Sequence, residues 1–373
     1  MRLVLVLVLC FSSLARAAVP QPPSVIGKSW LLADFTSGQV LAAQAPDERI
    51  EPASLTKLMT GYLVFSAIRD RKLSPEQRVS VSENASRAPG ARMFLRAGTQ
   101  VSVDDLVRGM EVQSGNDAAI ALAEAVAGSE ESFARMMNEE AERLGMKDTL
   151  FRNATGLPDA QHYTTTRDLY LLATALIRDF PQSYAQYYSQ KEFRYSGVSQ
   201  PNRNRLLWID PSVDGVKTGH TESAGFCLIA SAKRGERRLI SIVVGATSDS
   251  ARAQESLKLL NWGFQFFDDV KLRGANQEVK ALQVWKGAAR TVPAGFASDL
   301  VLTVPKGEGE KLKAELLSQQ PLVAPVSQGQ RVGTLRVSLD GKPLGEYPLV
   351  ALEPVPVAGL FGRAWDTLRL WLK

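Results

Sequence analysis

The sequence predicts an α+β fold in which an antiparallel sheet is flanked by helices and carries a helical subdomain, followed by a small β-rich domain and a C-terminal amphipathic helix. Residues 102–180 have mostly helical periodicity, whereas residues 191–246 change to short strands separated by Gly and charged turns. Beyond about residue 270, the segments alternate in polarity or are β-rich, with Gly and Pro between them. The 373 residues allow about two domains at roughly 100 to 200 residues each.

The first 17 residues have the pattern of a secretory signal peptide. Arg2 precedes an apolar run over residues 3–11, and a small-x-small cleavage site ends at Ala17. The run is far shorter than the roughly 20 apolar residues that a membrane span requires, which disfavours an anchor. Cys10 raises a lipoprotein signal as a third interpretation, but the leucine before it is too bulky for that motif. We therefore expect residues 1–17 to be removed on export.

Cysteine, charge and histidine content exclude several classes of function. Export leaves Cys227 as a single cysteine, so no intrachain disulfide is expected, and its apolar run at residues 226–230 predicts a buried, inert thiol. The formal net charge of +5 falls to +3 without the two arginines of the leader, and no basic run is interleaved with aromatic residues, so nucleic acid is not expected as a partner. His162 and His220 lie far apart without ligand spacing, so neither a metal nor another cofactor is expected.

The chain after the leader is expected to form a hairpin and then a helix. Residues 29–44 hold two apolar segments on either side of a turn at Thr36-Ser37-Gly38. Pro52 precedes a helix start near Ser54. The apolar residues that follow recur near a 3.6-residue period: Leu55, Leu58, Met59, Tyr62, Phe65 and Ile68.

Helices are expected to continue through the insertion. Ser102 is suited to cap one helix, and an alanine-rich helix follows Asn116 and stops near Gly128. Another helix runs through residues 133–144, and a further one follows residues 166–168.

The next part of the chain predicts three antiparallel strands closed by a helix. One strand carries Lys217 and Thr218, the next covers residues 226–231, and the third covers residues 238–244. The short connections between these strands imply antiparallel pairing. A long helix, about residues 251–267, closes the domain.

The C-terminal part predicts a β domain and then an amphipathic helix. The β-rich segments are residues 278–285, 299–304, 331–339 and 347–351, and they contain no catalytic constellation, so a spacer or supporting role is expected. Residues 360–373 place apolar side chains on one helical face and charged ones on the other. This pattern fits an interfacial membrane helix that is too short to span, or alternatively a helix docked on the β domain. Two tryptophans on the apolar face favour the membrane.

Chemistry is indicated first by Ser54-Leu55-Thr56-Lys57 at the expected helix start. At a spacing of three, the two polar side chains share one helix face, so the amine of Lys57 can approach the hydroxyl of Ser54. A serine hydroxyl attacks a carbonyl only when an adjacent base removes its proton. Alone, the pair is far more typical of a solvated helix face than of a catalytic site.

Two further motifs accompany this pair. Ser114-Gly115-Asn116 lies between two helical patterns, and Lys217-Thr218-Gly219 lies in a strand pattern. Order and spacing match the S-x-x-K, S-x-N and K-T-G signature of penicillin-interacting serine enzymes. A second S-x-N occurs at Ser82-Glu83-Asn84, so only the ordered set of three is specific.

The chain resembles the low-molecular-weight penicillin-binding proteins that act as D-alanyl-D-alanine carboxypeptidases. The resemblance is carried by residues 52–60, by Asn202-Arg203-Asn204, by residues 214–225 and by residues 259–264. It extends from the leader to the C-terminal helix. It implies a catalytic domain of the penicillin-binding and β-lactamase type at residues 24–268, a β-rich domain at 272–355 and a membrane-anchoring helix at 358–373.

The resemblance also implies roles for individual residues. Ser54 would be the acylated nucleophile and Lys57 its general base, while Ser114 would relay a proton and Asn116 would hold the substrate amide. Lys217 with Thr218 would hold substrate on an edge strand, and backbone N–H groups of Ser54 and His220 would meet the oxyanion. Arg203 and Arg252 are candidates for binding the terminal carboxylate, although solvated surface arginines are an equal alternative for Arg203.

The function implied is removal of the terminal D-alanine from peptidoglycan pentapeptides at the periplasmic face of the inner membrane. The expected partners are a stem peptide ending in D-Ala-D-Ala, β-lactam antibiotics as inhibitors, and a membrane surface at the C-terminal helix. A β-lactamase is the first alternative, but residues 153–168 lack the E-x-x-L-N stretch of class A enzymes. A peptidoglycan endopeptidase and a non-enzymatic wall scaffold also remain, the scaffold being disfavoured by the intact motifs.

Overall fold

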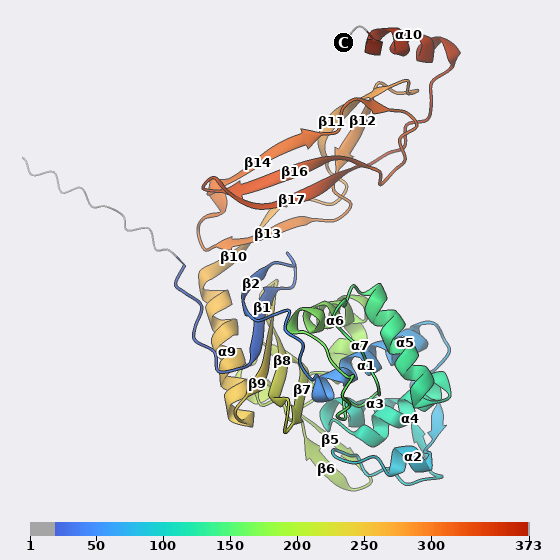
Figure 1. Ribbon diagram of the computed structural model, residues 1–373, viewed down its shortest axis with the longest axis vertical. Helices are drawn as coiled ribbons and strands as arrows, with labels where there is room; N and C mark the ends of the chain where they lie inside the picture. The colour runs from blue at the N-terminus through green and yellow to red at the C-terminus, as the bar shows by residue number, and fades with distance from the viewer. Residues whose placement is uncertain (1–18, 372–373) are drawn as a thin grey trace, which may run out of the picture.

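The structure, a computed structural model, describes residues 19–371. The leader expected at residues 1–17 lies outside the described residues. Figure 1 shows a region of helices packed beside a sheet, a β-rich region stacked on its end, and helix α10 (Leu360–Trp371) at the far end of the β-rich region. The predicted α+β fold class is confirmed.

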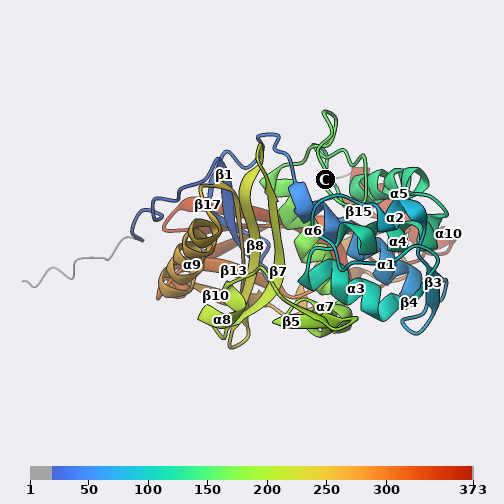
Figure 2. The ribbon, with the colours of Figure 1, turned by 90° about the horizontal axis from the view of Figure 1, so that it is seen from below.

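The central sheet has five antiparallel strands in the order β2-β1-β9-β8-β7. Figure 2 shows this sheet between helix α9 (Asp249–Phe266) on one side and the helices of residues 57–187 on the other. Because successive side chains of a strand point to opposite faces, Leu31 and Ala33 enter the core under the helices while Trp30 and Leu32 enter the core under α9. The strands are β1 (Ser29–Asp34), β2 (Val40–Gln44), β7 (Val213–Thr221), β8 (Gly225–Arg234) and β9 (Arg237–Ala246).

The helical subdomain is organised around α1 (Lys57–Arg69), which is buried along most of its length. A single 3₁₀ turn, η1 (Ala53–Thr56), precedes it and carries Ser54. Ser102 caps α3 as predicted, accepting a hydrogen bond from the N–H of Asp105. Around α1 lie α3 (Val103–Val112), α4 (Asn116–Ala127), α5 (Glu130–Arg143), α6 (Thr166–Asp179) and α7 (Pro181–Tyr187).

Several short elements of this region were not predicted individually, although short strands were expected from residue 191 onwards. The hairpin β5 (Glu192–Tyr195) and β6 (Val198–Pro201) turns at Ser196 and Gly197, both of which have positive φ. The others are α2 (Glu83–Ser86), α8 (Leu206–Ile209) and the paired strands β3 (Arg78–Ser80) and β4 (Gln100–Ser102).

The β-rich region begins where α9 ends. Strand β10 (Phe267–Arg273) pairs with β13 (Leu300–Pro305), and a six-stranded sheet follows in the order β14-β16-β17-β12-β11-β15. Three of its strands, β12, β14 and β15, were not predicted. The six strands are β11 (Glu278–Trp285), β12 (Thr291–Gly295), β14 (Leu312–Ser318), β15 (Leu322–Val323), β16 (Arg331–Leu339) and β17 (Lys342–Ala351), and 3₁₀ turn η2 (Gly309–Lys311) precedes β14.

The two regions meet at a polar junction. Arg237 of β9 forms ion pairs with Asp34 of β1 and Asp269 of β10, at 3.0 and 3.2 Å. The Thr303 hydroxyl on β13 lies 2.6 Å from that of Ser37 and donates to Asp269. The β-rich region is therefore fixed to the turn between β1 and β2 by hydrogen-bonded charges.

Helix α10 leaves most of its apolar side chains in solvent. Phe361 is 94% exposed and Trp371 is 84% exposed. Asp366, from the charged face, instead contacts the β-rich region and accepts a hydrogen bond from the backbone N–H of Lys286. The large apolar side chains described on this face, Leu360, Phe361, Trp365 and Trp371, are therefore not docked on the β-rich region. Within residues 19–371, we find no helix with the length and apolar character needed to cross a membrane.

Candidate active site

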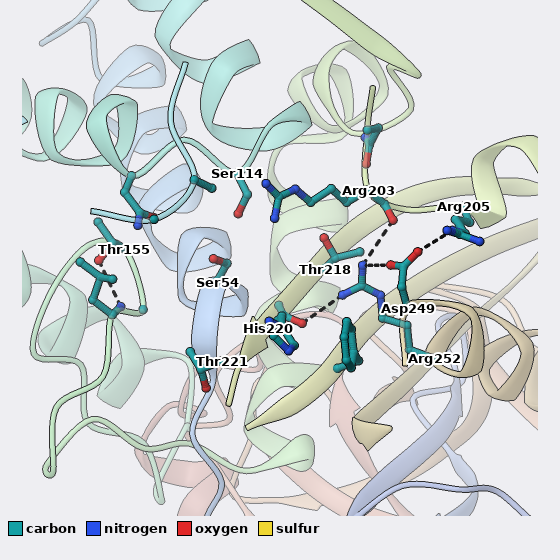
Figure 3. A pocket seen from close by; sticks show the side chains of 18 of the residues that line it. Ser54, Ser114, Thr155, Arg203, Arg205, Thr218, His220, Thr221, Asp249 and Arg252 are labelled. Atoms are coloured by element: carbon teal, nitrogen blue, oxygen red, sulfur yellow. Dashed lines mark hydrogen bonds and ion pairs between the residues drawn. The ribbon is translucent and has the colours of Figure 1, made fainter. Parts of the chain in front are cut away.

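A pocket of about 600 Å³ lies between the edge strand β7 and the helical subdomain. Figure 3 shows Ser54 at its centre, Thr218 and His220 on the β7 side, and Ser114 on the helical side. Lys57 and Lys217 lie behind this lining and are almost fully buried. The predicted site residues that line the pocket are Ser54, Ser114, Asn116, Arg203, Thr218, His220 and Arg252.

The hydroxyl of Ser54 and the amine of Lys57 are in hydrogen-bond contact, with Oγ 3.1 Å from Nζ. The spacing of three residues produces this contact across the junction of η1 and α1. The same Nζ donates to the carbonyl oxygen of Thr155 at 2.6 Å and to Oδ1 of Asn116 at 2.7 Å. Two carbonyl acceptors can hold the two hydrogens of a neutral amine, which leaves its lone pair directed at Ser54.

Burial, reinforced by the positive charge of Lys217, holds the pKa of the Lys57 amine well below its ordinary value of 10.5. Burial also lowers the pKa of Lys217, to about 8. A lysine with a lowered pKa can accept a proton near neutral pH. The two buried lysines therefore have the electrostatics required of a general base and of a nearby cation.

Ser114 and Lys217 are poorly satisfied within the described structure. The buried hydroxyl of Ser114 has no hydrogen-bond partner there. Lys217 Nζ has a single long contact, 3.5 Å to the carbonyl oxygen of Thr218. Buried polar groups without partners are costly, so these two are available to a bound ligand.

Two glycines allow the backbone to close around Ser54. A Cβ on Gly219 would lie 3.2 Å from the carbonyl oxygen of Pro52, so the K-T-G strand approaches η1 closely. Gly156, with φ +81°, packs against Ala53, and a Cβ there would lie 1.7 Å from the Ala53 carbonyl oxygen. Only glycine fits this second position.

The guanidinium of Arg252 forms one end of the pocket. It donates to the carbonyl oxygens of Gly219 at 3.1 Å and Cys227 at 3.3 Å, and it pairs with Asp249. Asp249 also pairs with Arg205 (Figure 3). Much of the donor capacity of Arg252 is thus used to hold β7, whereas the Arg203 side chain points across the pocket toward Ser114.

Sequence reasoning missed three contributors to the site. The carbonyl of Thr155 carries no side-chain signal. The buried carboxylate of Asp117 accepts the N–H groups of Met93 and Leu95, both at 3.0 Å, and so fixes the segment beside Asn116. Glu111 is buried in the last turn of α3, and the signal available was a carboxylate between two apolar residues just before Ser114.

The remaining predictions concern cysteine and metal. Cys227 is buried as predicted, and burial raises the pKa of its thiol to about 11, which keeps the thiol protonated. The described part of the chain holds no cluster of three or more His, Cys, Asp or Glu side chains that could bind a metal ion.

A serine hydroxyl beside a buried amine of lowered pKa, with the Ser114 hydroxyl lining the same cavity and the weakly bonded cation of Lys217 behind it, defines an acyl-transferring serine hydrolase of the Ser–Lys class. The chain belongs to the D-alanyl-D-alanine carboxypeptidase family, peptidase family S11, whose profile matches residues 16–248. The profile of the penicillin-binding protein 5 C-terminal domain matches residues 267–357. The protein is thus a serine peptidase and a hydrolase.

Individual relatives extend over nearly the whole chain. The D-alanyl-D-alanine carboxypeptidase DacC of Escherichia coli K12 is 44% identical over 363 residues, covering 95% of this chain and 90% of the relative. Penicillin binding protein 5 from Haemophilus influenzae has a TM-score of 0.87 at 40% identity and covers 90% of this chain and 99% of that chain. Penicillin-binding protein D2 from Listeria monocytogenes, in its ampicillin bound form, has a TM-score of 0.59 at 32% identity and covers 64% and 98%.

Proposed function

We propose that the protein removes the terminal D-alanine from peptidoglycan stem peptides ending in D-Ala-D-Ala, through an acyl-enzyme on Ser54. The observation that carries this proposal is the contact between Ser54 and Lys57, together with the two carbonyl acceptors that direct the Lys57 lone pair at the Ser54 hydroxyl. The family membership and the named activities of the relatives support it.

In the proposed reaction, Lys57 takes the proton of Ser54 as Oγ attacks the carbonyl carbon of the penultimate D-alanine. The backbone N–H groups of Ser54 and His220, which both line the pocket, would stabilise the oxyanion. The C–N bond then breaks, and Ser114 relays a proton to the amine of the departing D-alanine. A water molecule hydrolyses the remaining ester and regenerates Ser54.

Substrate binding is assigned to the cationic side of the pocket. Lys217 and Thr218 on the edge strand would hold the peptide, with Asn116 contacting its amide. Arg203 is the better candidate for contact with the terminal carboxylate, because Arg252 already donates to two backbone carbonyls and to Asp249. Arg252 would then act mainly by holding the strand that carries the K-T-G motif.

Penicillins and related β-lactams are proposed to acylate the same serine. Their strained amide carbonyl can be attacked by Ser54 in the way that the peptide is attacked, and a relative from Listeria monocytogenes is described in its ampicillin bound form. Slow hydrolysis of the ester would make these compounds inhibitors.

The place of action is proposed to be the periplasmic face of the inner membrane. The signal-like leader and the cell-wall substrate of the named relatives support export. The exposed apolar side chains of α10, including Phe361 and Trp371, support an interfacial contact at the far end of the β-rich region. The β-rich region would then separate the pocket from the membrane surface.

The proposed activity is tested by measuring D-alanine release from a soluble peptide that ends in D-Ala-D-Ala. The mature protein is compared with Ser54→Ala and with Ser82→Ala, which removes the serine of the second S-x-N motif. Release that disappears only in Ser54→Ala supports the proposal. A protein that binds labelled penicillin but releases no D-alanine would have another substrate, such as a crosslinked peptide.

A further inference from the structure

Glu111 is a buried carboxylate immediately behind the pocket. It is 3% exposed, lies in the last turn of α3, and precedes Ser114 by three residues. A Cβ on Gly61 of α1 would lie 3.0 Å from Glu111 Oε1, so the carboxylate packs directly against the α1 backbone. Gly61 follows Lys57 by four residues and shares its face of the helix. Glu111 therefore packs against α1 one helical turn from Lys57, the residue whose amine contacts Ser54.

The carboxylate of Glu111 is incompletely satisfied. Its Oε1 accepts a hydrogen bond from the hydroxyl of Tyr188 at 3.0 Å. Its Oε2 has no hydrogen-bond partner within the described residues. A carboxylate in this position is costly as an anion unless nearby positive charge compensates it.

Charged groups face Glu111 from several elements. Lys57 on α1 and Lys217 on β7 supply the positive charge, and burial raises the pKa of Glu111 to about 7 against the opposing effects of Lys217, Tyr188 and Lys57. Tyr188 remains neutral because burial raises its pKa well above 10, as it does for Tyr184.

Further charges act on the two lysines. Arg203 lowers the pKa of both lysines, Arg252 lowers that of Lys217, and Asp117 raises that of Lys57. Glu111 raises the pKa of both lysines. It is thus the anion shared by the general base and by the substrate-binding cation.

We propose that Glu111 is a positioning residue for the reaction: its buried carboxylate keeps Lys217 cationic for substrate and limits how readily Lys57 loses its proton. This inference rests on the proposed function of the Ser54 site. Glu111 acts through the two lysines and does not line the pocket. The substitution of a neutral side chain should therefore change the pH range of acylation.

The test is the pH dependence of Ser54 acylation by a fluorescent penicillin, measured for the full mature chain and Glu111→Gln. Removing the Glu111 carboxylate lowers the pKa of Lys217. The alkaline limb of the acylation rate plotted against pH should therefore move to lower pH by about one unit. The acid limb should move less, because Glu111 itself takes up a proton near pH 7. Glu111→Asp, which keeps the charge, should restore the alkaline limb.

Glu255→Gln is the matched control. Glu255 is also 3% exposed and also has one oxygen without a hydrogen-bond partner in the described residues, but it lies on α9 and pairs with Lys258. Its substitution should leave both limbs in place. Tyr188→Phe supplies a second variant: losing the Tyr188 hydrogen bond raises the pKa of Glu111, so the alkaline limb should move in the same direction as in Glu111→Gln, but less.

The inference would be overturned if the alkaline limb of the pH profile stays at its native pH in Glu111→Gln. If that variant does not fold, the same result in Tyr188→Phe would overturn it. Glu111 would then be a packing residue. Parallel measurement of D-alanine release separates this result from failure of the proposed function. A shifted penicillin profile without D-alanine release would uphold the role of Glu111 at the Ser–Lys site and reject the proposed peptide substrate.

Discussion

The amide group of Asn116 is fixed at both ends: its Oδ1 lies 2.7 Å from Lys57 Nζ, and its Nδ2 donates to the carbonyl oxygen of Pro89 at 2.7 Å. Because the nitrogen donates one of its two hydrogens to Pro89, the oxygen must face Lys57. Asn116 is the first residue of α4, whose opening turn is held to the segment beside it by the bond from its N–H to the Ala91 carbonyl. The orientation of the proposed general base thus depends on one amide on a neighbouring helix.

Asn116→Ala should therefore slow acylation more than it weakens the fold. Without Oδ1, one hydrogen of the Lys57 amine loses its acceptor and the lone pair is no longer directed at Ser54, so we expect a loss of roughly 100-fold in the acylation rate. The measurement is the rate of labelling by fluorescent penicillin. Asn84→Ala, in the exposed second S-x-N motif, is the control and should retain the native rate. A native labelling rate in Asn116→Ala would contradict the positioning role of the Asn116 amide.

Gly156→Ala should displace the backbone that positions the nucleophile Ser54. The new Cβ would lie 1.7 Å from the carbonyl oxygen of Ala53, so the residue before Ser54 must move. Gly145→Ala is matched in backbone conformation, with φ +80° against +81°, but meets nothing within 4 Å. We expect Gly145→Ala to cost about 1 to 2 kcal/mol of unfolding free energy with native acylation. Gly156→Ala should cost more and abolish acylation, as measured by urea unfolding and penicillin labelling; equal effects in the two variants would contradict the close packing.

His162 should make the protein less stable as the pH falls. Burial lowers its pKa from 6.5 to about 4, and its Nε2 lies 3.0 Å from the hydroxyl of Thr56. The unfolded chain protonates His162 at a higher pH than the folded chain does. The stability that depends on neutral His162 is therefore fully present above pH 6.5 and is lost as the pH falls towards 4. The loss should be on the order of 3 kcal/mol at most.

The check is the urea unfolding free energy at pH 7 and pH 5. His162→Gln should show a smaller decrease between the two pH values than the native protein. The chain contains two histidines, so His220→Gln on the exposed end of β7 is a complete control and should keep the native decrease. A native pH response in His162→Gln would assign the acid sensitivity to other groups.

Much of the site could be predicted because its residues lie on regular elements with strong periodicity. Ser54 and Lys57 are one turn apart, and Asn116 begins the alanine-rich helix that the sequence indicated. The β-strand carrying Lys217 was equally clear, and its place at the edge of the sheet brings it to the helical subdomain.

The unpredicted parts depend on contacts between segments far apart in the sequence. The acceptor from Thr155 is a backbone carbonyl, and Glu111 acquires its role only because Gly61 lets α3 approach α1. Strand β14 was missed because its side chains are mostly exposed, so no apolar alternation marks it. Arg252 was assigned to substrate, and its hydrogen bonds to Gly219 and Cys227 could not be foreseen without the pairing of β7 and β8.

Arg237→Gln should destabilise the junction between the two regions. Arg237 lies between the carboxylates of Asp34 and Asp269, and burial, with repulsion from Asp34 next, raises the pKa of Asp269 to about 6. Removing the cation leaves the buried carboxylate of Asp34 beside the half-buried one of Asp269, which should cost about 3 kcal/mol of unfolding free energy near pH 8. The cost should be smaller at pH 5, because protonation of Asp269 removes the repulsion.

Arg336→Gln is the comparison for the junction. Its ion pair with Glu346 on the β-rich sheet is exposed, so its removal should change stability by less than about 0.5 kcal/mol at either pH. Penicillin labelling should remain native in Arg237→Gln, since the junction lies outside the pocket lining. A cost equal to that of Arg336→Gln would show that the junction is held by other contacts.

The proposed contact of α10 with a membrane should depend on the exposed apolar side chains of this helix. Phe361, Trp365 and Trp371 are 94, 62 and 84% exposed, while Asp366 accepts a hydrogen bond from the β-rich region. A helix that presents such a face binds at a lipid interface through buried apolar area and basic residues. Replacing these three residues with serine should abolish co-flotation of the mature protein with phospholipid vesicles, while D-alanine release from a soluble peptide stays native.

The double variant Trp208→Ser with Ile209→Ser controls for lost apolar surface in general. These side chains are 48 and 57% exposed on α8, in the region that carries the pocket, and their loss should leave flotation unchanged. Because the proposed contact is mainly apolar, high salt should reduce binding to anionic vesicles only partly, and binding to zwitterionic vesicles should persist. Flotation that survives in the triple α10 variant, or that is lost in the α8 variant instead, would place the membrane contact elsewhere on the protein.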